Sequence, residues 1–385
     1  IMEDFTHDRL TDIEKTYFVA ATFTRGLSTE EIVDLTRAMV ETGKKIKFSG
    51  ITLDKHSIGG LPGNRTTMII VPILAAAGFT VAKTSSRAIT SAAGTADTME
   101  CLAQVELTEK EIKEVVHKTG ACMVHGGAMQ LAPADDKIIE VEHPLSIDPE
   151  GQLLASVMAK KYSVSSQYVL IDIPMGKTSK VHTREKAKHL QHMFELIGRK
   201  LGMQIKVIIT DGSQPIGRGV GPLLEAQDVL AVLRNDPDAP QDLKKKSLMM
   251  AGLLLDMTRK NSQNKMEVSG IKTAQEILES GKAWKKMHQI IHAQGAVKRP
   301  KIGQYRYEVR CNCLGRVKEI DNEVIAKIAR IAGAPEDKGA GLYVVKKLHD
   351  IVKKDDLLYS VYAESKAKLE LAKEMVHKDH GYVVR

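Results

Sequence analysis

Residues 52–67 read TLDKHSIGGLPGNRTT and lie between an extended segment and a long apolar run. A strand, a Gly-rich turn and a helix start form an anion site, because backbone N–H groups and the positive end of the helix dipole point at the ligand. Lys55 would add a full positive charge, and the hydroxyls of Ser57, Thr66 and Thr67 would add donors. Lys55 precedes the glycines, so this stretch is not a Walker P-loop. A tight turn beside a solvated lysine is the alternative interpretation.

Three further segments are also rich in groups that bind phosphate: residues 84–97, 155–161 and 210–221. In the second of them, Ser156 and Lys160 are four residues apart, so on a helix they share one face. Taken singly, each segment is more typical of a helix cap or a solvated helix face. Together they supply more phosphate-type donors than a structural protein needs.

Several common catalytic motifs are missing from the sequence, namely Gly-x-Ser-x-Gly, His-Glu-x-x-His and Cys-x-x-Cys. Their absence argues against serine hydrolases, zinc peptidases and thiol redox enzymes, and no metal or cofactor is expected. Cys311 and Cys313 could form a metal or redox pair, but alternating positions of a strand are the favoured interpretation. Four cysteines are too few for a disulfide scaffold, which favours a reducing cytoplasm.

The elements that must position these segments follow from the apolar pattern. Helices are expected over residues 1–50, with capping boxes at Thr11 and Ser28. Short strands are expected near residues 78–84, 122–125, 168–173 and 206–211, and helices over 108–120 and 183–201. Apolar strands that alternate with amphipathic helices predict a parallel sheet that binds ligands at the carboxyl ends of its strands.

We therefore predict an α/β fold class with a small all-helical domain and a larger domain built on the sheet. The helical domain is discontinuous and combines residues 1–50 with 128–165, whereas the α/β domain combines 51–127 with 166–385. From about residue 304, shorter strands and a helix near 324–332 predict a smaller α+β part. Two domains joined by few crossings would form a cleft, and such clefts commonly close on a substrate.

Length and composition limit the possible partners. The chain has 385 residues, 43% hydrophobic and 27% charged, with a formal charge of +8. A basic nucleotide- or RNA-binding protein is the non-enzyme alternative, but aromatic residues make up only 4%, few for stacking on bases. No apolar run approaches the ~20 residues of a membrane span, and no signal peptide is recognised. Because the chain begins with Ile1, earlier residues are expected to be missing.

Four motifs now point to a family. Residues 54–60 (DKHSIGG), 131–135 (LAPAD), 155–161 (ASVMAKK) and 210–217 (TDGSQPIG) occur in the order found in the thymidine and pyrimidine nucleoside phosphorylases. The resemblance extends from about Phe18 to the C-terminus. It implies a helical domain and an α/β domain that close on a nucleoside and inorganic phosphate, in a homodimer or a higher assembly, with neither nucleic acid nor membrane as partner.

Within this family, the sequence is most similar to the archaeal AMP phosphorylases. Residues 86–91 (SRAITS) followed by 92–95 (AAGT) resemble that branch. Val141 stands where the pyrimidine enzymes carry an Arg that would grip a pyrimidine carbonyl. The resemblance implies phosphorolysis of AMP, with CMP and UMP as further candidates, in nucleotide degradation or salvage. A thymidine or pyrimidine nucleoside phosphorylase is the alternative. We expect the chain to lack the extra N-terminal domain of the AMP branch.

The resemblance also implies a set of site residues. Asp148 would be the proton donor, with His56 and Lys160 as secondary candidates. Phosphate would bind at one lysine and several hydroxyls, namely Lys55, Ser57, Thr67, Ser85 and Thr95. The choice between Thr66 and Thr67 stays open. AMP would contact Gly60, Ser86, Arg87, Ala88, Ile89, Thr90, Ser91, Thr95, Ser156 and Lys180.

The chemistry of phosphorolysis suits these residue types. Phosphate attacks C1′ of the ribose while the base departs, through a transition state like the oxocarbenium ion of glycoside hydrolysis. A purine leaves more easily when N7 is protonated, so a carboxylic acid kept partly neutral is a suitable donor. Asp148 precedes Pro149, and a simple Asp-Pro turn is its alternative interpretation. Arg87 lies among serines and threonines, a set suited to the 5′-phosphate dianion.

Overall fold

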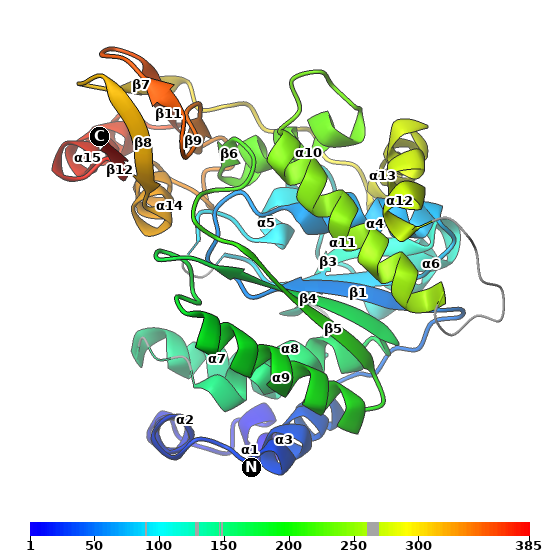
Figure 1. Cartoon of the computed structure of the whole chain (residues 1–385). Coiled ribbons are helices and arrows are strands. Elements are labelled where there is room, and N and C mark those ends of the chain that lie inside the picture. Colours follow the sequence, from blue (N-terminus) through cyan, green and yellow to red (C-terminus); the bar gives the residue numbers. More distant parts are fainter. Residues whose placement is uncertain (89–90, 128–130, 146, 148, 260–268) are drawn as a thin grey trace.

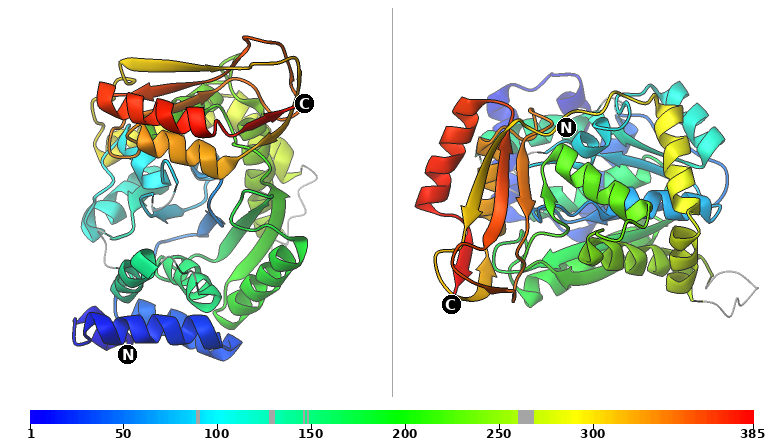
Figure 2. Two further views of the ribbon diagram at one scale, coloured as in Figure 1. Left: turned by 90° about the vertical axis from the view of Figure 1, so that its left-hand side faces the viewer. Right: turned by 90° about the horizontal axis from the view of Figure 1, so that it is seen from above.

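The computed structural model describes residues 1–88, 91–127, 131–145, 147, 149–259 and 269–385. A parallel sheet runs through the middle of the molecule, with helices on both of its faces (Figure 1). The C-terminal part and the first helices lie at opposite ends, with the sheet between them (Figure 2, left). The predicted α/β fold with a helical part is therefore confirmed.

Five parallel strands form the central layer in two hydrogen-bonded groups. One group has the order β1-β4-β5, and β2 pairs with β3 in the other. A bridge between Thr52 and Thr80 joins them. The strands are β1 (Leu53–Ser57), β2 (Val81–Ser85), β3 (Ala121–His125), β4 (Tyr168–Met175) and β5 (Gln204–Asp211). All five strands point the same way, so their carboxyl ends meet at one edge.

Helices on one side of the sheet come from two separate segments of the chain. These are α1 (Met2–Thr6), α2 (Asp12–Arg25), α3 (Thr29–Glu41), α7 (Pro133–Leu145) and α8 (Glu150–Tyr162). Thr11 and Ser28 both close the capping boxes that the sequence predicts. Helix α9 (Arg184–Lys200) lies against β5 and contacts α3 and α8, so one apolar core joins these helices to a face of the sheet.

In the described part of the remaining α/β region there are seven helices, several of them on the opposite face of the sheet (Figure 1). They are α4 (Thr66–Ala76), α5 (Thr95–Glu100), α6 (Glu109–Thr119), α10 (Pro222–Leu233), α11 (Gln241–Arg259), α12 (Gly270–Glu279) and α13 (Lys282–Gln294). Helix α4 is buried from Thr66 to Ala75 and contacts α11 and α13. An apolar helix with no polar face belongs in the core, so the N-terminus of α4 is fixed rigidly.

The C-terminal part contains both strands and helices. It contains β7 (Tyr305–Arg310), β8 (Gly315–Ile320), α14 (Asn322–Ile331), β9 (Gly341–Val344), β10 (Ile351–Val352), β11 (Leu357–Ala363), α15 (Lys366–Lys378) and β12 (Tyr382–Val384). Strand β6 (Gly219–Val220) pairs with β9 and so ties this part to the loop after β5. Within the described residues, no helix is both long and apolar enough to cross a membrane.

The strand interpretation of Cys311 and Cys313 is wrong. Strand β7 ends at Arg310, and the Cys311 thiol lies 3.1 Å from the carbonyl oxygen of Cys313 in the turn before β8. Both thiols are free. Asn312 and Gly315 are common turn residues, and the two-residue spacing of the cysteines was given more weight than this cue.

Candidate active site

Lys55 lies in β1 with only 2% of its surface exposed. Its ammonium group donates a hydrogen bond to the hydroxyl of Thr66, 2.8 Å away, at the first residue of α4. The predicted strand, Gly-rich turn and helix start therefore come together, and the lysine is buried rather than solvated. This contact brings Thr66 into the reach of Lys55.

The charge of Lys55 is set by its surroundings. Burial lowers the pKa of its ammonium group to about 7, the nearby Asp172 carboxylate opposes this shift, and Lys246 and Arg65 add to it. A lysine with a pKa near neutrality is suited to an anionic ligand. The negative charge of the bound ligand would raise that pKa and keep the ammonium group protonated.

Asp172 organises the polar side chains around Lys55. Its fully buried carboxylate in β4 accepts hydrogen bonds from Ser57 (2.9 Å) and Thr210 (2.5 Å), and it pairs with Lys246 of α11 (3.1 Å). Burial alone would raise the pKa of Asp172, but the Lys246 and Lys55 ammonium groups hold it below its usual value. The sequence reasoning missed this residue. Its only signal is a carboxylate inside the apolar strand YVLIDI.

Arg65 connects the Gly-rich turn to the loop before α5. Its guanidinium donates to the Thr95 hydroxyl (3.0 Å) and the Ala93 carbonyl (2.9 Å), and it pairs with Glu225 of α10. Burial raises the pKa of Glu225 against the opposing effect of Arg65. This positioning residue was also missed, although a basic residue directly before an apolar helix was visible in the sequence.

A second buried charge cluster lies beside His56. Asp54 pairs with Lys161 (2.7 Å) and Lys83 (3.4 Å). Burial lowers the pKa of Lys161 to about 7. The pKa of His56 lies well below its usual value, because of burial first and then the charges of Lys161 and Lys83. The imidazole is therefore neutral at pH 7 and weak as a proton donor.

Ser156 and Lys160 share one face of α8, as their spacing predicts. Both bind the buried Asp135 of α7, with Ser156 3.0 Å from its carboxylate, and Lys160 also lies 2.8 Å from Ser156. The alternative of a solvated helix face is therefore wrong. Asp135 belongs to the LAPAD motif, so two of the four motifs meet here.

Arg87 contacts a different set of groups from the one the sequence suggested. Its guanidinium binds Glu100 with two hydrogen bonds (2.8 and 2.9 Å), Glu106 (2.9 Å) and Asp97 (3.3 Å). These three carboxylates surround a single guanidinium and neutralise it. Its contacts therefore do not support a 5′-phosphate ligand at Arg87. The three carboxylates are 10 to 19 residues further along the sequence, so these ion pairs could not be deduced from the local pattern.

The loop that contains Ser86 and Ala88 folds back onto the start of α5. The Asp97 carboxylate accepts hydrogen bonds from the backbone N–H groups of Ala88 (2.7 Å) and Gly94 (2.8 Å). The Ser91 hydroxyl donates to the Ala93 carbonyl (3.1 Å). Ile89 and Thr90, two of the predicted AMP contacts, lie outside the described residues, as does the predicted acid Asp148.

Gly60 and Lys180, two further predicted AMP contacts, lie against each other. Gly60 has φ +88°, and a Cβ there would lie 3.3 Å from the Lys180 backbone nitrogen. The turn after β1 thereby meets the segment after β4 at the carboxyl edge of the sheet. Ser85 ends β2 at the same edge.

Comparison with known proteins identifies the chain. Residues 49–284, more than half of it, match the glycosyl transferase family, a/b domain. Residues 1–43 match the helical bundle domain of that family, and residues 316–382 match the pyrimidine nucleoside phosphorylase C-terminal domain. The chain belongs to this phosphorylase family of glycosyl transferases. It is therefore an enzyme that transfers a pentosyl group.

Similar members of this family carry two kinds of name. AMP phosphorylase 1 of Archaeoglobus fulgidus is 47% identical over 100% of this chain and 76% of its own length. AMP phosphorylase of Thermococcus kodakarensis is 49% identical over 97% of this chain and 74% of its own. A Methylococcus capsulatus protein, provisionally named a thymidine phosphorylase, is 45% identical over 99% of this chain and 74% of its own.

Among solved structures, anthranilate phosphoribosyltransferase from Thermus thermophilus shares the fold. Its TM-score is 0.62 at 19% identity, and the match covers 76% of this chain and 93% of that one. At this level of identity, only the architecture is common to the two. Among the described residues of this family member, no three His, Cys, Asp or Glu side chains converge on a metal site.

Proposed function

We propose that this enzyme is an AMP phosphorylase that acts in nucleotide degradation or salvage. The observation that carries the proposal is the 44–49% identity, over nearly the whole chain, to archaeal proteins named AMP phosphorylase. Its substrates are AMP and inorganic phosphate, with CMP and UMP as further nucleotides. It acts in the cytoplasm as a homodimer, without nucleic acid as a partner.

The reaction replaces one bond at C1′ by another. A phosphate oxygen forms a bond to C1′, the bond from C1′ to the base nitrogen breaks, and the base leaves with a proton. The products are the free base and ribose 1,5-bisphosphate. The bonds formed and broken and the proton transferred balance without an oxidant or a metal.

Inorganic phosphate binds at the buried end of β1 and the start of α4. Lys55, Ser57, Ser85 and Thr95 supply the charge and hydroxyls, together with Thr66 or Thr67. The hydrogen bond of Lys55 to Thr66 favours Thr66 for this role. A cation and hydroxyls fixed by Asp172 and Arg65 hold the nucleophile in place without taking part in proton transfer.

AMP binds along the same edge of the sheet. The proposed contacts are Gly60, Lys180, Ser156 and Thr95 together with the segment 86–91. The close approach of Gly60 to Lys180 and the Ser156–Lys160–Asp135 network support a preformed surface on both sides of the nucleotide.

Asp148 protonates the leaving base, and His56 is the secondary candidate. In the sequence, Asp148 is two residues before Glu150, where α8, the helix that carries Ser156, begins. The lowered pKa of His56 disfavours the protonated imidazole that would act as the acid, which speaks against His56 in this role.

A thymidine or pyrimidine nucleoside phosphorylase is the second candidate. The relatives provisionally named thymidine phosphorylase, at 42–47% identity, favour it. Val141 at the place of the pyrimidine-binding Arg speaks against it.

One experiment separates the two candidates. The purified enzyme is incubated with phosphate and AMP, CMP, UMP, adenosine or thymidine, and the free base and sugar phosphate are quantified by chromatography. We expect turnover of the nucleotides, fastest with AMP, and little from the nucleosides. Equal or faster turnover of thymidine would refute the proposed function.

A further inference from the structure

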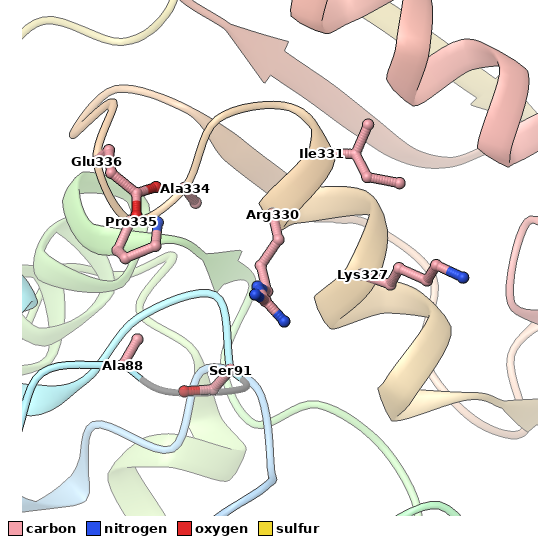
Figure 3. Close-up of a pocket in the computed structure, with 8 residues that line it drawn as sticks. All are labelled: Ala88, Ser91, Lys327, Arg330, Ile331, Ala334, Pro335 and Glu336. Carbon is pink, nitrogen blue, oxygen red and sulfur yellow. The ribbon is translucent and has the colours of Figure 1, made fainter. Parts of the chain in front are cut away.

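A pocket of about 400 Å³ lies between the predicted nucleotide loop and the C-terminal part. On one side it is lined by Ala88 and Ser91, and on the other by α14 and the turn that follows it (Figure 3). None of the residues proposed above to bind AMP or phosphate lies on α14. This wall of the pocket therefore has no assigned role in the proposed function.

Two cations of α14 line the pocket. Arg330 extends from the helix toward Ser91, and Lys327, one turn earlier, lies at the rim and extends away from the loop (Figure 3). Both side chains are exposed, and among the described residues neither lies within ion-pair distance of a carboxylate. Glu336 lines the pocket at the opposite end, beside Pro335. The pocket is thus polarised, with its positive end facing Ser91.

The arginine among the proposed AMP contacts, Arg87, is not available to a 5′-phosphate. Three carboxylates already bind the Arg87 guanidinium. Arg330 instead approaches Ser91 from α14 with unpaired donors. An arginine with free N–H groups can bind a phosphomonoester with two parallel hydrogen bonds.

The pocket lies close enough to the phosphate site for one nucleotide to reach both. Ser91, in the pocket, is four residues from Thr95, which Arg65 ties to the Gly-rich turn. Four residues span at most about 14 Å when fully extended. The loop is folded here, since Ser91 hydrogen-bonds to Ala93, so the true separation is shorter.

We propose that Arg330 binds the 5′-phosphate of the substrate nucleotide, with Ser91 as a second donor and Lys327 as a nearby charge. This inference rests on the proposed function, because it names the subsite that distinguishes a nucleotide from a nucleoside. It assigns part of the substrate specificity to the C-terminal part of the chain.

The test compares Arg330→Ala and Arg330→Lys with the native enzyme, on AMP and on adenosine at saturating phosphate. Hydrogen bonds to a charged group are strong, so we expect Arg330→Ala to raise KM for AMP about 10- to 100-fold. Its kcat/KM for adenosine and its KM for phosphate should stay unchanged. Arg330→Lys should recover part of the loss. Lys366→Ala removes an exposed cation at the start of α15 and serves as the matched control.

The outcomes separate this inference from the proposed function. A native enzyme that uses adenosine as well as AMP would refute the proposed function itself. A native enzyme that prefers AMP, combined with an unchanged KM in Arg330→Ala, would refute the Arg330 subsite alone. A rise in KM for phosphate instead of AMP would mean that the bound anion is inorganic phosphate, which also overturns the inference. Arg330 is exposed, so thermal unfolding of the variant should match that of the native enzyme.

Discussion

Among single residues, Lys55 gives the anion site a dependence on pH. The pKa of its buried ammonium group is about 7, so the free enzyme loses this charge as pH rises through 7. We predict that sulfate, which stays a dianion throughout, inhibits competitively against phosphate with a Ki that rises with pH. Between pH 6.5 and 8.5 the increase should be about 25-fold, the ratio of the charged fractions for a pKa of 7.

The control for this prediction is Lys55→Met, which removes the titrating charge. Its Ki for sulfate should be high and independent of pH over the same range. A native Ki that stays constant from pH 6.5 to 8.5 would mean that Lys55 keeps its charge or lies away from the anion.

Asp148 is the residue on which the proton transfer depends. Asp148→Asn keeps the shape of the side chain and removes the proton, and general acid catalysis typically contributes about 10²–10⁴-fold. We predict that kcat on AMP falls by that order while KM for AMP changes little. A purine base that is already alkylated at N7 can leave without protonation. Turnover of a nucleotide with such a base should therefore be nearly unaffected by the substitution. An equal loss on both substrates would make Asp148 a positioning residue.

The sequence predicted the donors of the site better than the groups that hold them. Lys55, Ser57 and Ser156 were visible because cations and hydroxyls follow strands or share a helix face. Asp172 was missed because its partners Ser57 and Thr210 are 115 and 38 residues away. Local spacing predicts which groups could bind an anion, whereas a buried counter-charge is defined only once distant strands are paired.

Among the elements, the turn between β1 and α4 has the tightest packing requirement. Gly63 has φ +72°, and a Cβ there would lie 2.0 Å from the Ile216 carbonyl oxygen in the loop after β5. We predict that Gly63→Ala destabilises the enzyme by more than the ~1–2 kcal/mol cost of a left-handed residue. It should also raise KM for phosphate, because the turn sets the position of Thr66. Urea unfolding and initial-rate kinetics measure the two effects.

Gly59→Ala is the matched control for this turn. A Cβ at Gly59 would meet nothing within 4 Å, and its backbone is outside the left-handed region. Its unfolding midpoint and its KM for phosphate should both stay close to the native values. If the two variants unfolded at the same urea concentration, the close approach at Gly63 would not be what stabilises this turn.

Helices were predicted more accurately than the pairing of strands. The capping boxes at Thr11 and Ser28 mark the starts of α2 and α3, and the helix predicted over 183–201 is α9, Arg184–Lys200. These signals are local. Strand β6 lies in a stretch that reads only as a Gly-rich turn, and its partner β9 is some 120 residues further along the chain. No pattern within the turn could predict that pairing.

At the scale of the whole molecule, the helical end presents an unusual apolar surface. On α2, Ile13 is 82% and Tyr17 is 77% exposed, and Phe23 is 52% exposed. Ile13 and Tyr17 are four residues apart and so lie on one face of the helix. Two large apolar side chains on one exposed face, here Ile13 and Tyr17, are typical of a protein interface. The surface lies at the opposite end of the molecule from the C-terminal part (Figure 2, left).

We predict that this face of α2 forms part of the interface of the proposed homodimer. Tyr17→Glu places a charge in the interface, so sedimentation velocity should show a native dimer and a monomeric variant at micromolar concentration. Ile351→Glu, at another exposed apolar residue in the C-terminal part, is the control and should remain a dimer. Because Lys55 and Asp172 lie in the sheet and not on α2, the Tyr17→Glu monomer should still bind sulfate with native affinity. A native monomer, or a Tyr17→Glu variant that stays dimeric, would exclude this face of α2 as the interface.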